Sequence, residues 1–421
     1  MVEQTYKIYR YRWIVLAVFM LIMAAIEVMW ICFAPITGDA SKFYHISELQ
    51  VGFFAMSFMV VYVPLSIPIA WLIDTYGYRK AVSIGAVLMG VAGLLRGVFG
   101  ASYIGVLLST LALGAAQPFM MNAISPVAAR WFPINERATA SGLALVATFL
   151  GIAIGQVLSP VLFLSYGIPG MLMIYGIFGA ACTLLFLVLT RDAPPTPPCP
   201  PGQEGRALML DGLKSMLKMK DIWILLALFL VAMGIFNGIT TWIETIVRPR
   251  GLSINQAGDL GAALLVGGIA GSIIMSALSD HYRRRKAFLL AGMVCAIPGM
   301  LGVALGQTYG IMMMSMLILG FFLVSLAPIG YQYGAEITYP APEGTSNGLL
   351  NMAGQVSVVF IYAMDALKSP DGSFTGSLLV LVGLMILSVF LIIALRESTL
   401  IGTRQLEELG PALVEPEQEA L

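Results

Sequence analysis

Long apolar runs recur along the whole chain and are separated by short polar segments. A helix that crosses the hydrocarbon layer of a membrane, about 30 Å thick, needs about 20 apolar residues. Twelve runs reach that length, at residues 13–37, 50–73, 81–100, 103–129, 138–164, 167–190, 221–247, 256–279, 287–307, 309–334, 344–367 and 373–395. The pattern predicts an all-α membrane protein with 12 transmembrane helices in two six-helix halves.

The longest polar segment divides the two sets of runs. Residues 192–205 hold six prolines, which exclude a helix and favour an extended linker. Residues 206–220 place Met209, Leu213, Met216 and Leu217 on one helical face, as in an amphipathic helix on a membrane surface. The predicted parts are an N-terminal half (1–191), a cytoplasmic linker (192–220), a C-terminal half (221–396) and a disordered acidic tail (397–421).

The distribution of Lys and Arg predicts how the chain lies in the membrane. Of the 23 basic residues, 18 fall in segments on the same side as the N-terminus, and four fall in segments on the other side. Cytoplasmic segments of membrane proteins are enriched in Lys and Arg. We therefore expect a multi-pass protein of the cell (inner or plasma) membrane with both termini in the cytoplasm.

Composition narrows the class of protein further. The chain is 59% apolar and 11% charged, against about 45–50% and about 25% in soluble domains, so a soluble enzyme is excluded. Lys+Arg and Asp+Glu are 23 each, which leaves no basic field to attract nucleic acid. The four cysteines lie far apart, so we expect free thiols and no metal site. We expect no cofactor and no enzyme activity, and a monomer whose partners are a small-molecule substrate and the lipid bilayer.

The two halves repeat the same polar residues at a constant offset. Asp74, Tyr76, Arg79, Lys80 and Ala81 return 206 residues later as Asp280, Tyr282, Arg285, Lys286 and Ala287. Phe132-Pro133 returns 207 residues later as Tyr339-Pro340. Parallel repeats of six helices are typical of one architecture of secondary transporters.

The repeated basic loop resembles the motif G-x-x-x-D-x-x-G-R-R/K of the major facilitator superfamily. The first copy reads Asp74-Thr-Tyr-Gly77-Tyr-Arg79-Lys80, with Ala70 in place of the leading glycine, and the second has Ser276 and Arg283 in place of the two glycines. The resemblance implies a transporter fold in which Asp74, Gly77 and Arg79, with Asp280 and Arg285, form gating loops at the inner side. The simpler interpretation is that these cations only fix the topology.

A second resemblance is to the feline leukaemia virus subgroup C receptor-related transporters, which move choline and ethanolamine and were earlier described as haem exporters. It rests on Glu336 to Asn351, Ala116-Gln117, Val63-Pro64-Leu65 and Trp71-Leu-Ile-Asp74. The resemblance implies a pocket with Trp30, Gln117 and Gln355, and departs from the family at Asn237, where the family has tyrosine. Aromatic faces hold quaternary ammonium groups at about 0.5–2 kcal/mol each, so the missing tyrosine weakens the assignment of choline itself.

Ionisable residues at membrane depth are functional candidates by default. Glu27 lies 14 residues into the first run, about 21 Å along a helix, and shares a helix face with Trp30. Its carboxylate could receive an organic cation, bind a coupling proton, or pair with a neighbouring helix. Near the outer end of the seventh run, Glu244 and Arg248 are candidates for an outer gate.

These observations predict a transporter, secondary active or facilitative, that moves a small organic cation or an amino alcohol such as choline or ethanolamine by alternating access. Trp30 would supply the cation–π face, Glu27 the counter-charge, and Gln117, Asn237 and Gln355 hydrogen bonds. No Lys or Arg lies at mid-span in runs 1, 4, 5, 7, 8, 10 or 11, which disfavours an anion pocket. Two alternatives remain: a proton-coupled carrier of a monocarboxylate or another small metabolite, with Glu27 as the proton site, and a receptor on a transporter scaffold.

Overall fold

The structure is a computed structural model that describes residues 8–196, 216–338 and 343–397. Within these ranges all regular secondary structure is helical. Because lipid offers no hydrogen-bond partners, a chain crossing it must satisfy its backbone groups internally, and a helix does so within one segment. The predicted amphipathic stretch, 206–220, lies mostly outside the described residues, and the predicted acidic tail lies almost entirely outside them.

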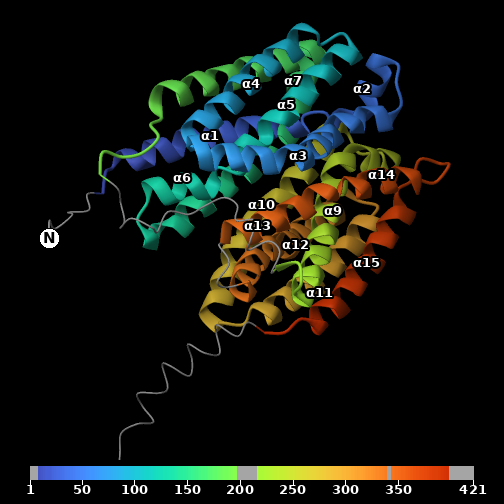
Figure 1. Cartoon of the computed structure of the whole chain (residues 1–421). Coiled ribbons are helices and arrows are strands. Elements are labelled where there is room, and N and C mark those ends of the chain that lie inside the picture. The colour runs from blue at the N-terminus through green and yellow to red at the C-terminus, as the bar shows by residue number, and fades with distance from the viewer. Residues whose placement is uncertain (1–7, 197–215, 339–342, 398–421) are drawn as a thin grey trace, which may run out of the picture.

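The helices form two bundles that follow each other along the chain (Figure 1). The first contains α1 (Tyr11–Ile31), η1 (Ala34–Ile36), α2 (Thr37–Tyr44), α3 (Glu48–Tyr76), α4 (Tyr78–Val98), α5 (Tyr103–Met121), α6 (Ile124–Trp131) and α7 (Ile134–Leu189). The second contains α9 (Lys220–Val247), η2 (Arg248–Arg250), α10 (Ile254–Tyr282), α11 (Arg285–Leu305), α12 (Tyr309–Ile337), α13 (Glu343–Val356), α14 (Val358–Ala366) and α15 (Thr375–Ala394). This arrangement confirms the predicted all-α fold in two halves.

The number of membrane crossings depends on α7. Eleven helices of the described residues are long and apolar enough to cross a membrane, and α7 counts once although it has 56 residues. Inside it, Gly167 has φ 67° and ψ 179°, a left-handed φ that favours glycine. Ser159 Oγ lies 2.9 Å from Tyr175 OH, whereas residues 16 apart in a straight helix are separated by about 24 Å. The chain therefore doubles back at Gly167, and α7 supplies two of the twelve predicted crossings.

Three predicted spans are broken rather than continuous, which corrects the sequence-based expectation. The run 13–37 divides after Ile31, 103–129 divides between α5 and α6, and 344–367 divides at Ser357. Polar side chains mark two of the breaks: Asn122 donates to the main-chain oxygen of Ser66 at 2.9 Å, and Ser357 Oγ accepts from Asn237 at 3.0 Å. Hydropathy reports the length of an apolar run, so it could not reveal these interruptions.

The internal repeat extends to the way that helices begin. Ser47 caps α3 and Ser253 caps α10, and each forms a capping box with the glutamine three residues later. In both boxes the glutamine Oε1 accepts from the serine main-chain N–H at 2.9 Å. These caps satisfy amide groups that an unpaired helix start would leave without partners.

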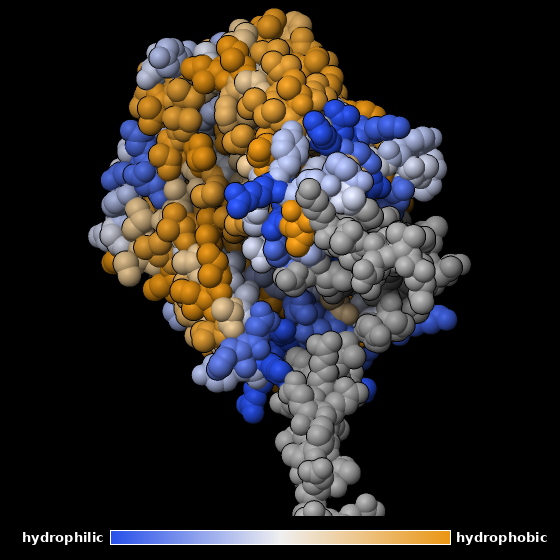
Figure 2. Space-filling view, turned by 90° about the vertical axis from the view of Figure 1, so that its left-hand side faces the viewer, coloured by the Kyte–Doolittle hydropathy of each residue, from blue (hydrophilic) through white to orange (hydrophobic). Residues whose placement is uncertain are grey.

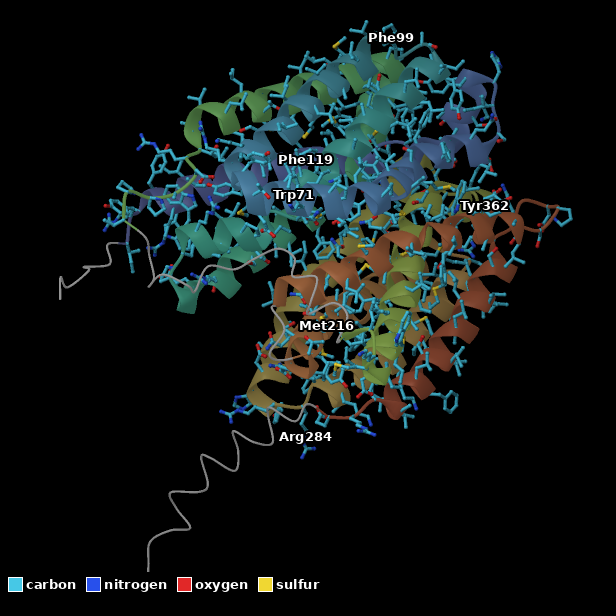
Figure 3. All side chains as sticks on the ribbon, in the orientation of Figure 1. Trp71, Phe99, Phe119, Met216, Arg284 and Tyr362 are labelled. Carbon is cyan, nitrogen blue, oxygen red and sulfur yellow. The ribbon has the colours of Figure 1, made fainter. Side chains whose placement is uncertain are left out.

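The loops define two faces of the molecule. We call the face that carries the α3–α4 and α10–α11 loops, with Arg284, the terminal face, because α1 begins there and α15 ends there; the opposite face carries Phe99 and the α9–α10 loop (Figure 3). Figure 2 views the left-hand side of Figure 1 and shows hydrophilic patches beside large hydrophobic areas. Exposed apolar residues such as Trp71 and Tyr362 cover the flanks of the bundles, as expected for a lipid-facing surface.

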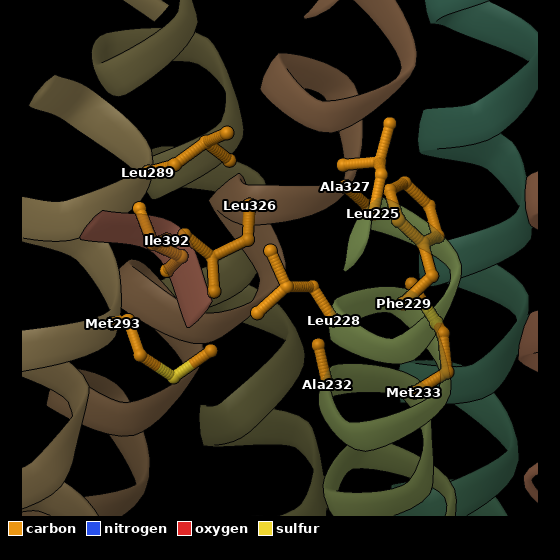
Figure 4. A pocket seen from close by; sticks show the side chains of 10 residues that line it. All are labelled: Leu225, Leu228, Phe229, Ala232, Met233, Leu289, Met293, Leu326, Ala327 and Ile392. Atoms are coloured by element: carbon orange, nitrogen blue, oxygen red, sulfur yellow. The ribbon is translucent and has the colours of Figure 1, made fainter. Parts of the chain in front are cut away.

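A small apolar gap lies inside the second half, between α9, α11, α12 and α15 (Figure 4). It measures about 20 Å³ and is lined by Leu, Ile, Met, Phe and Ala side chains, among them Leu228 and Met293. A gap of this size has room for about one water, but a buried water needs polar partners. We interpret it as a packing defect rather than as a binding site.

Candidate functional site

A large cavity lies between the two halves. Its volume is about 650 Å³, and residues of α1, α3, α5, α6 and α7 line it together with residues of α9, α10, α12 and α13. Small-molecule sites have volumes of about 300–1,000 Å³. The lining residues Thr139, Ser276 and Asn347 lie within one or two helical turns of the terminal-face ends of their helices. The cavity therefore extends from the middle of the molecule toward the terminal face, where the two bundles diverge (Figure 1).

All five predicted substrate-binding residues lie on the wall of this cavity. They are Glu27, Trp30, Gln117, Asn237 and Gln355. They come from four helices, α1, α5, α9 and α13, and from both halves of the chain. Their spatial grouping meets the geometric requirement of the predicted pocket, while their roles stay predictions.

Glu27 is the one charged side chain among the lining residues that the structure describes. It is 2% exposed and accepts a hydrogen bond from Gln117 Nε2 at 2.9 Å. The other amide atom, Gln117 Oε1, is buried with no partner in the structure. Burial of a carboxylate with no cation beside it costs free energy. The cavity is therefore suited to a solute that carries a positive charge or an additional proton.

Aromatic side chains form further walls of the cavity. Trp30 donates its indole N–H to the main-chain oxygen of Ala55 at 3.1 Å, which ties the ring to α3. The rings of Phe149 and Phe236 meet edge to face at 6.2 Å, and Tyr331 also lines the cavity. These three residues were not predicted, because nothing in the local sequence separates an aromatic residue that lines a cavity from one in the core.

Hydrogen bonds link the halves beside the cavity. Tyr62 OH donates to Asn122 Oδ1 at 3.0 Å and accepts from Asn351 Nδ2 at 2.9 Å. Asn237 donates to Ser357 at the break between α13 and α14. These side chains connect α3, α5, α9 and α13, so the helices that carry the predicted site are held by polar contacts as well as by packing.

An ion cluster joins the two halves at the opposite face. Arg248 binds both oxygens of Glu244, at 2.7 and 2.8 Å, and the role of this pair as an outer gate stays a prediction. Glu48 of the first half bridges Arg248 and Lys368 of the second half, each at 2.5 Å. The main-chain N–H of Gly38 also donates to Glu244 at 3.1 Å. Glu48 and Lys368 were not predicted, because partners 200 and 320 residues apart in sequence leave no local signal.

The two gating loops each bind within their own half. Arg285 pairs with Asp280, and it pairs with Glu336 at 3.1 Å. Arg79 donates to the main-chain oxygens of Thr190 at 2.7 Å and Leu187 at 3.2 Å. Gly77 has φ 88°, a conformation that favours glycine and reverses the chain between α3 and α4. Asp74 is exposed in the last turn of α3. The gating role of these loops stays a prediction.

The amino-acid sequence of the chain is similar to those of several known transporters. The chain is 31% identical over 391 residues to a choline/ethanolamine transporter, FLVCR1, of Mus musculus, covering 83% of this chain and 68% of that protein. It is 29% identical over 389 residues to solute carrier family 49 member A3 of Danio rerio, covering 88% and 81%. It is 28% identical over 400 residues to the human choline/ethanolamine transporter FLVCR2, covering 88% and 75%.

A solved structure shares the fold. It is a bacterial homologue of the human lysosomal transporter Spinster in an inward-facing and unoccupied conformation, with a TM-score of 0.77 and 17% identity over 94% of this chain and 99% of that one. The sequence pattern of the Major Facilitator Superfamily matches residues 13–362 and 243–415. Twelve crossings in two repeated halves, a cavity between them and these matches together establish that the chain belongs to the major facilitator superfamily.

Proposed function

We propose that this transporter moves a small organic cation or amino alcohol, such as choline or ethanolamine, by alternating access. The observation that carries the proposal is the charge of the cavity, in which Glu27 is the one charged lining residue among those described. A cation that leaves water needs a counter-charge or polar partners to offset its lost hydration. Relatives that are named choline/ethanolamine transporters support the same substrate class.

The other lining residues fit the chemistry of such a solute. The aromatic rings of Trp30, Phe149, Phe236 and Tyr331 offer faces that attract an ammonium group. The side chains of Gln117, Asn237 and Gln355 can hydrogen-bond a hydroxyl or a primary ammonium. This chain has Asn237 where the related family has an aromatic residue. Phe236, the preceding residue on α9, supplies an aromatic side chain to the same cavity instead.

The interface is closed at one face and open toward the other, which supports an assignment of this conformation to one state of the transport cycle. The opposite face is closed by the cluster of Glu48, Glu244, Arg248 and Lys368, whereas the cavity extends toward the terminal face. In the orientation predicted from Lys and Arg, the terminal face is cytoplasmic, so this conformation faces inward. Release of the cluster and approach of the gating loops would convert it to the outward-facing form.

The test is uptake of labelled choline and ethanolamine into proteoliposomes, with and without a pH gradient. We expect saturable uptake that needs no pH gradient and falls at least about tenfold in Glu27→Gln, which removes the counter-charge and keeps the shape. Asp259→Asn, an exposed acid on α10, is the matched control and should keep wild-type uptake.

Two outcomes would overturn the assignment. Uptake of monocarboxylates that requires a pH gradient and is lost in Glu27→Gln would indicate a proton-coupled anion carrier. Saturable binding of choline without flux, in vesicles that are shown to be sealed, would indicate a receptor.

A further inference from the structure

A buried glutamine of the first half enters the second half near the opposite face. Gln156 lies on α7 and is fully buried, at 0% exposure. Its Nε2 donates to the main-chain oxygen of Thr240 on α9 at 2.9 Å. The apolar run around it contains Gly151 and Gly155, five residues and one residue before it, at which α7 approaches α1. Gln156 is thus a polar residue in a tightly packed interface, and the cavity and the ion cluster do not involve it.

The second half provides a hollow of the right shape for this side chain. A Cβ added to Gly261 of α10 would lie 2.7 Å from Cδ and 2.9 Å from Oε1 of Gln156. A Cβ added to Gly258, one turn away, would meet the main-chain oxygen of Gln156. Real Cβ atoms do not approach other atoms so closely, so a side chain at position 258 would push α10 away from the α7 backbone, and one at position 261 would displace the side chain of Gln156.

The contact lies on the closed side of the cavity. Thr240 is seven residues from the opposite-face end of α9, and Gly261 is seven residues from that end of α10. Seven residues correspond to about 10 Å along a helix, so the contact lies about two helical turns below the ion cluster. When the halves part at this end, the side chain must leave the hollow and lose its bond to Thr240. Gln156 Oε1, which is buried with no partner here, would then gain access to water.

We propose that Gln156 is a positioning residue of the transport cycle that holds the opposite face closed by filling the Gly258–Gly261 hollow and donating to Thr240. Its side chain favours the conformation in which the cavity reaches the terminal face, whatever the solute. The hydrogen bond to Thr240 orients the side chain of Gln156, and the hollow at Gly258 and Gly261 provides the space that the side chain fills. The ion cluster closes the same face from the rim, where solvent and salt weaken it, whereas the glutamine contact is buried.

The test measures the conformational equilibrium directly, with spin labels on keto amino acids that leave the native cysteines in place. One label pair replaces Lys42 and Gln307 on the opposite face, and a second replaces Thr75 and Arg284 on the terminal face; all four side chains are exposed. Distance distributions are recorded in lipid nanodiscs without substrate, so failure of the cation assignment leaves this test unaffected.

In Gln156→Ala we expect the opposite-face distance to lengthen and the terminal-face distance to shorten, with at least about a threefold change in the ratio of the two conformers. Gln156→Met keeps the volume and loses the donor, so its shift should be smaller. Gly261→Ala should shift the ratio in the same direction, because the new methyl group meets Gln156. Gly383→Ala is the matched control, since a Cβ there meets no atom within 4 Å.

The double variant Gln156→Ala/Gly261→Ala separates positioning from general damage. The added methyl group occupies the space that the glutamine leaves, so we expect the conformer ratio to return toward wild type. Two results would overturn the proposal: wild-type distances in both single variants, or a double variant displaced further than either single variant. Folding is checked by gel filtration, and Gln156→Met provides the readout if Gln156→Ala does not fold.

Discussion

The interface between the two halves differs between its two ends. At the opposite face, charged groups of Glu48, Arg248 and Lys368 meet across the interface, and Gln156 fills a hollow in α10. Toward the terminal face, the same helices α7 and α10 line a cavity instead. One set of helices thus packs closely at one end and separates at the other, which is the geometry that alternating access requires.

The hydrogen bonding of the polar side chains suggests how the open and closed ends of the interface can change places during transport. The hydroxyls of Ser272 and Ser276, on the cavity side of α10, and the amide oxygen of Asn347 have no partner in the structure. Buried polar groups without partners are costly, whereas the charged groups of Glu48, Glu244, Arg248 and Lys368 at the opposite face are paired. We infer that these three groups find water or new partners as the cavity fills or closes. The opposite face thus has ion pairs across the interface, whereas these three groups on the cavity side have no hydrogen-bond partner.

Reversing the charge of Glu48 should reduce the difference between the two ends of the interface most strongly. Glu48→Lys would face Arg248 and Lys368 with a like charge, so we expect the opposite face to open and the conformer ratio to change by at least about tenfold. The Lys42–Gln307 label pair measures this change. Glu48→Lys combined with Lys368→Glu should recover part of the closed population.

The matched control for this charge reversal is Asp371→Lys. Asp371 is an exposed acid in the loop that follows α14 on the same face. Asp371→Lys should therefore leave the distance between the labels at Lys42 and Gln307 unchanged. Equal shifts in Glu48→Lys and Asp371→Lys would mean that net charge, and not the cluster, controls closure.

Removing the hydroxyl of Tyr62 should have an intermediate effect. Tyr62→Phe leaves the amides of Asn122 and Asn351 without their shared partner, which costs about 1–3 kcal/mol of stability. A lower melting temperature in detergent is the expected result. Tyr282→Phe, an exposed tyrosine, is the control, and an equal melting temperature in the two variants would contradict the role of the network.

Truncating a hydroxyl on the cavity side should have the smallest effect. Ser272 Oγ has no partner in this conformation, so Ser272→Ala removes no hydrogen bond and should not lower the free energy of unfolding. Ser159→Ala is the matched comparison, because Ser159 Oγ lies 2.9 Å from Tyr175 OH and donates to Gly155. A larger loss of melting temperature in Ser272→Ala than in Ser159→Ala would show that Ser272 already has a partner.

Much of the architecture was predictable because its cause is local. Apolar runs gave the crossings, including the pair that Gly167 joins within α7, and the offset between Asp74 and Asp280 revealed the repeat. The five substrate candidates could be grouped because polar residues in apolar runs are rare and the family resemblance aligned them. Their hydrogen bonds, such as that between Gln117 and Glu27, required the structure.

What the sequence alone determined was therefore the class of molecule: twelve apolar crossings, two repeated halves, and a carboxylate at membrane depth. These follow from composition and spacing, because the bilayer demands long apolar helices whatever their neighbours. Only the tertiary structure decided which residues meet across the halves, such as Glu48 with Lys368 and Gln156 with Gly261. Such pairs depend on how whole helices lie against one another, and glycine or glutamate in a helix carries no mark of its distant partner.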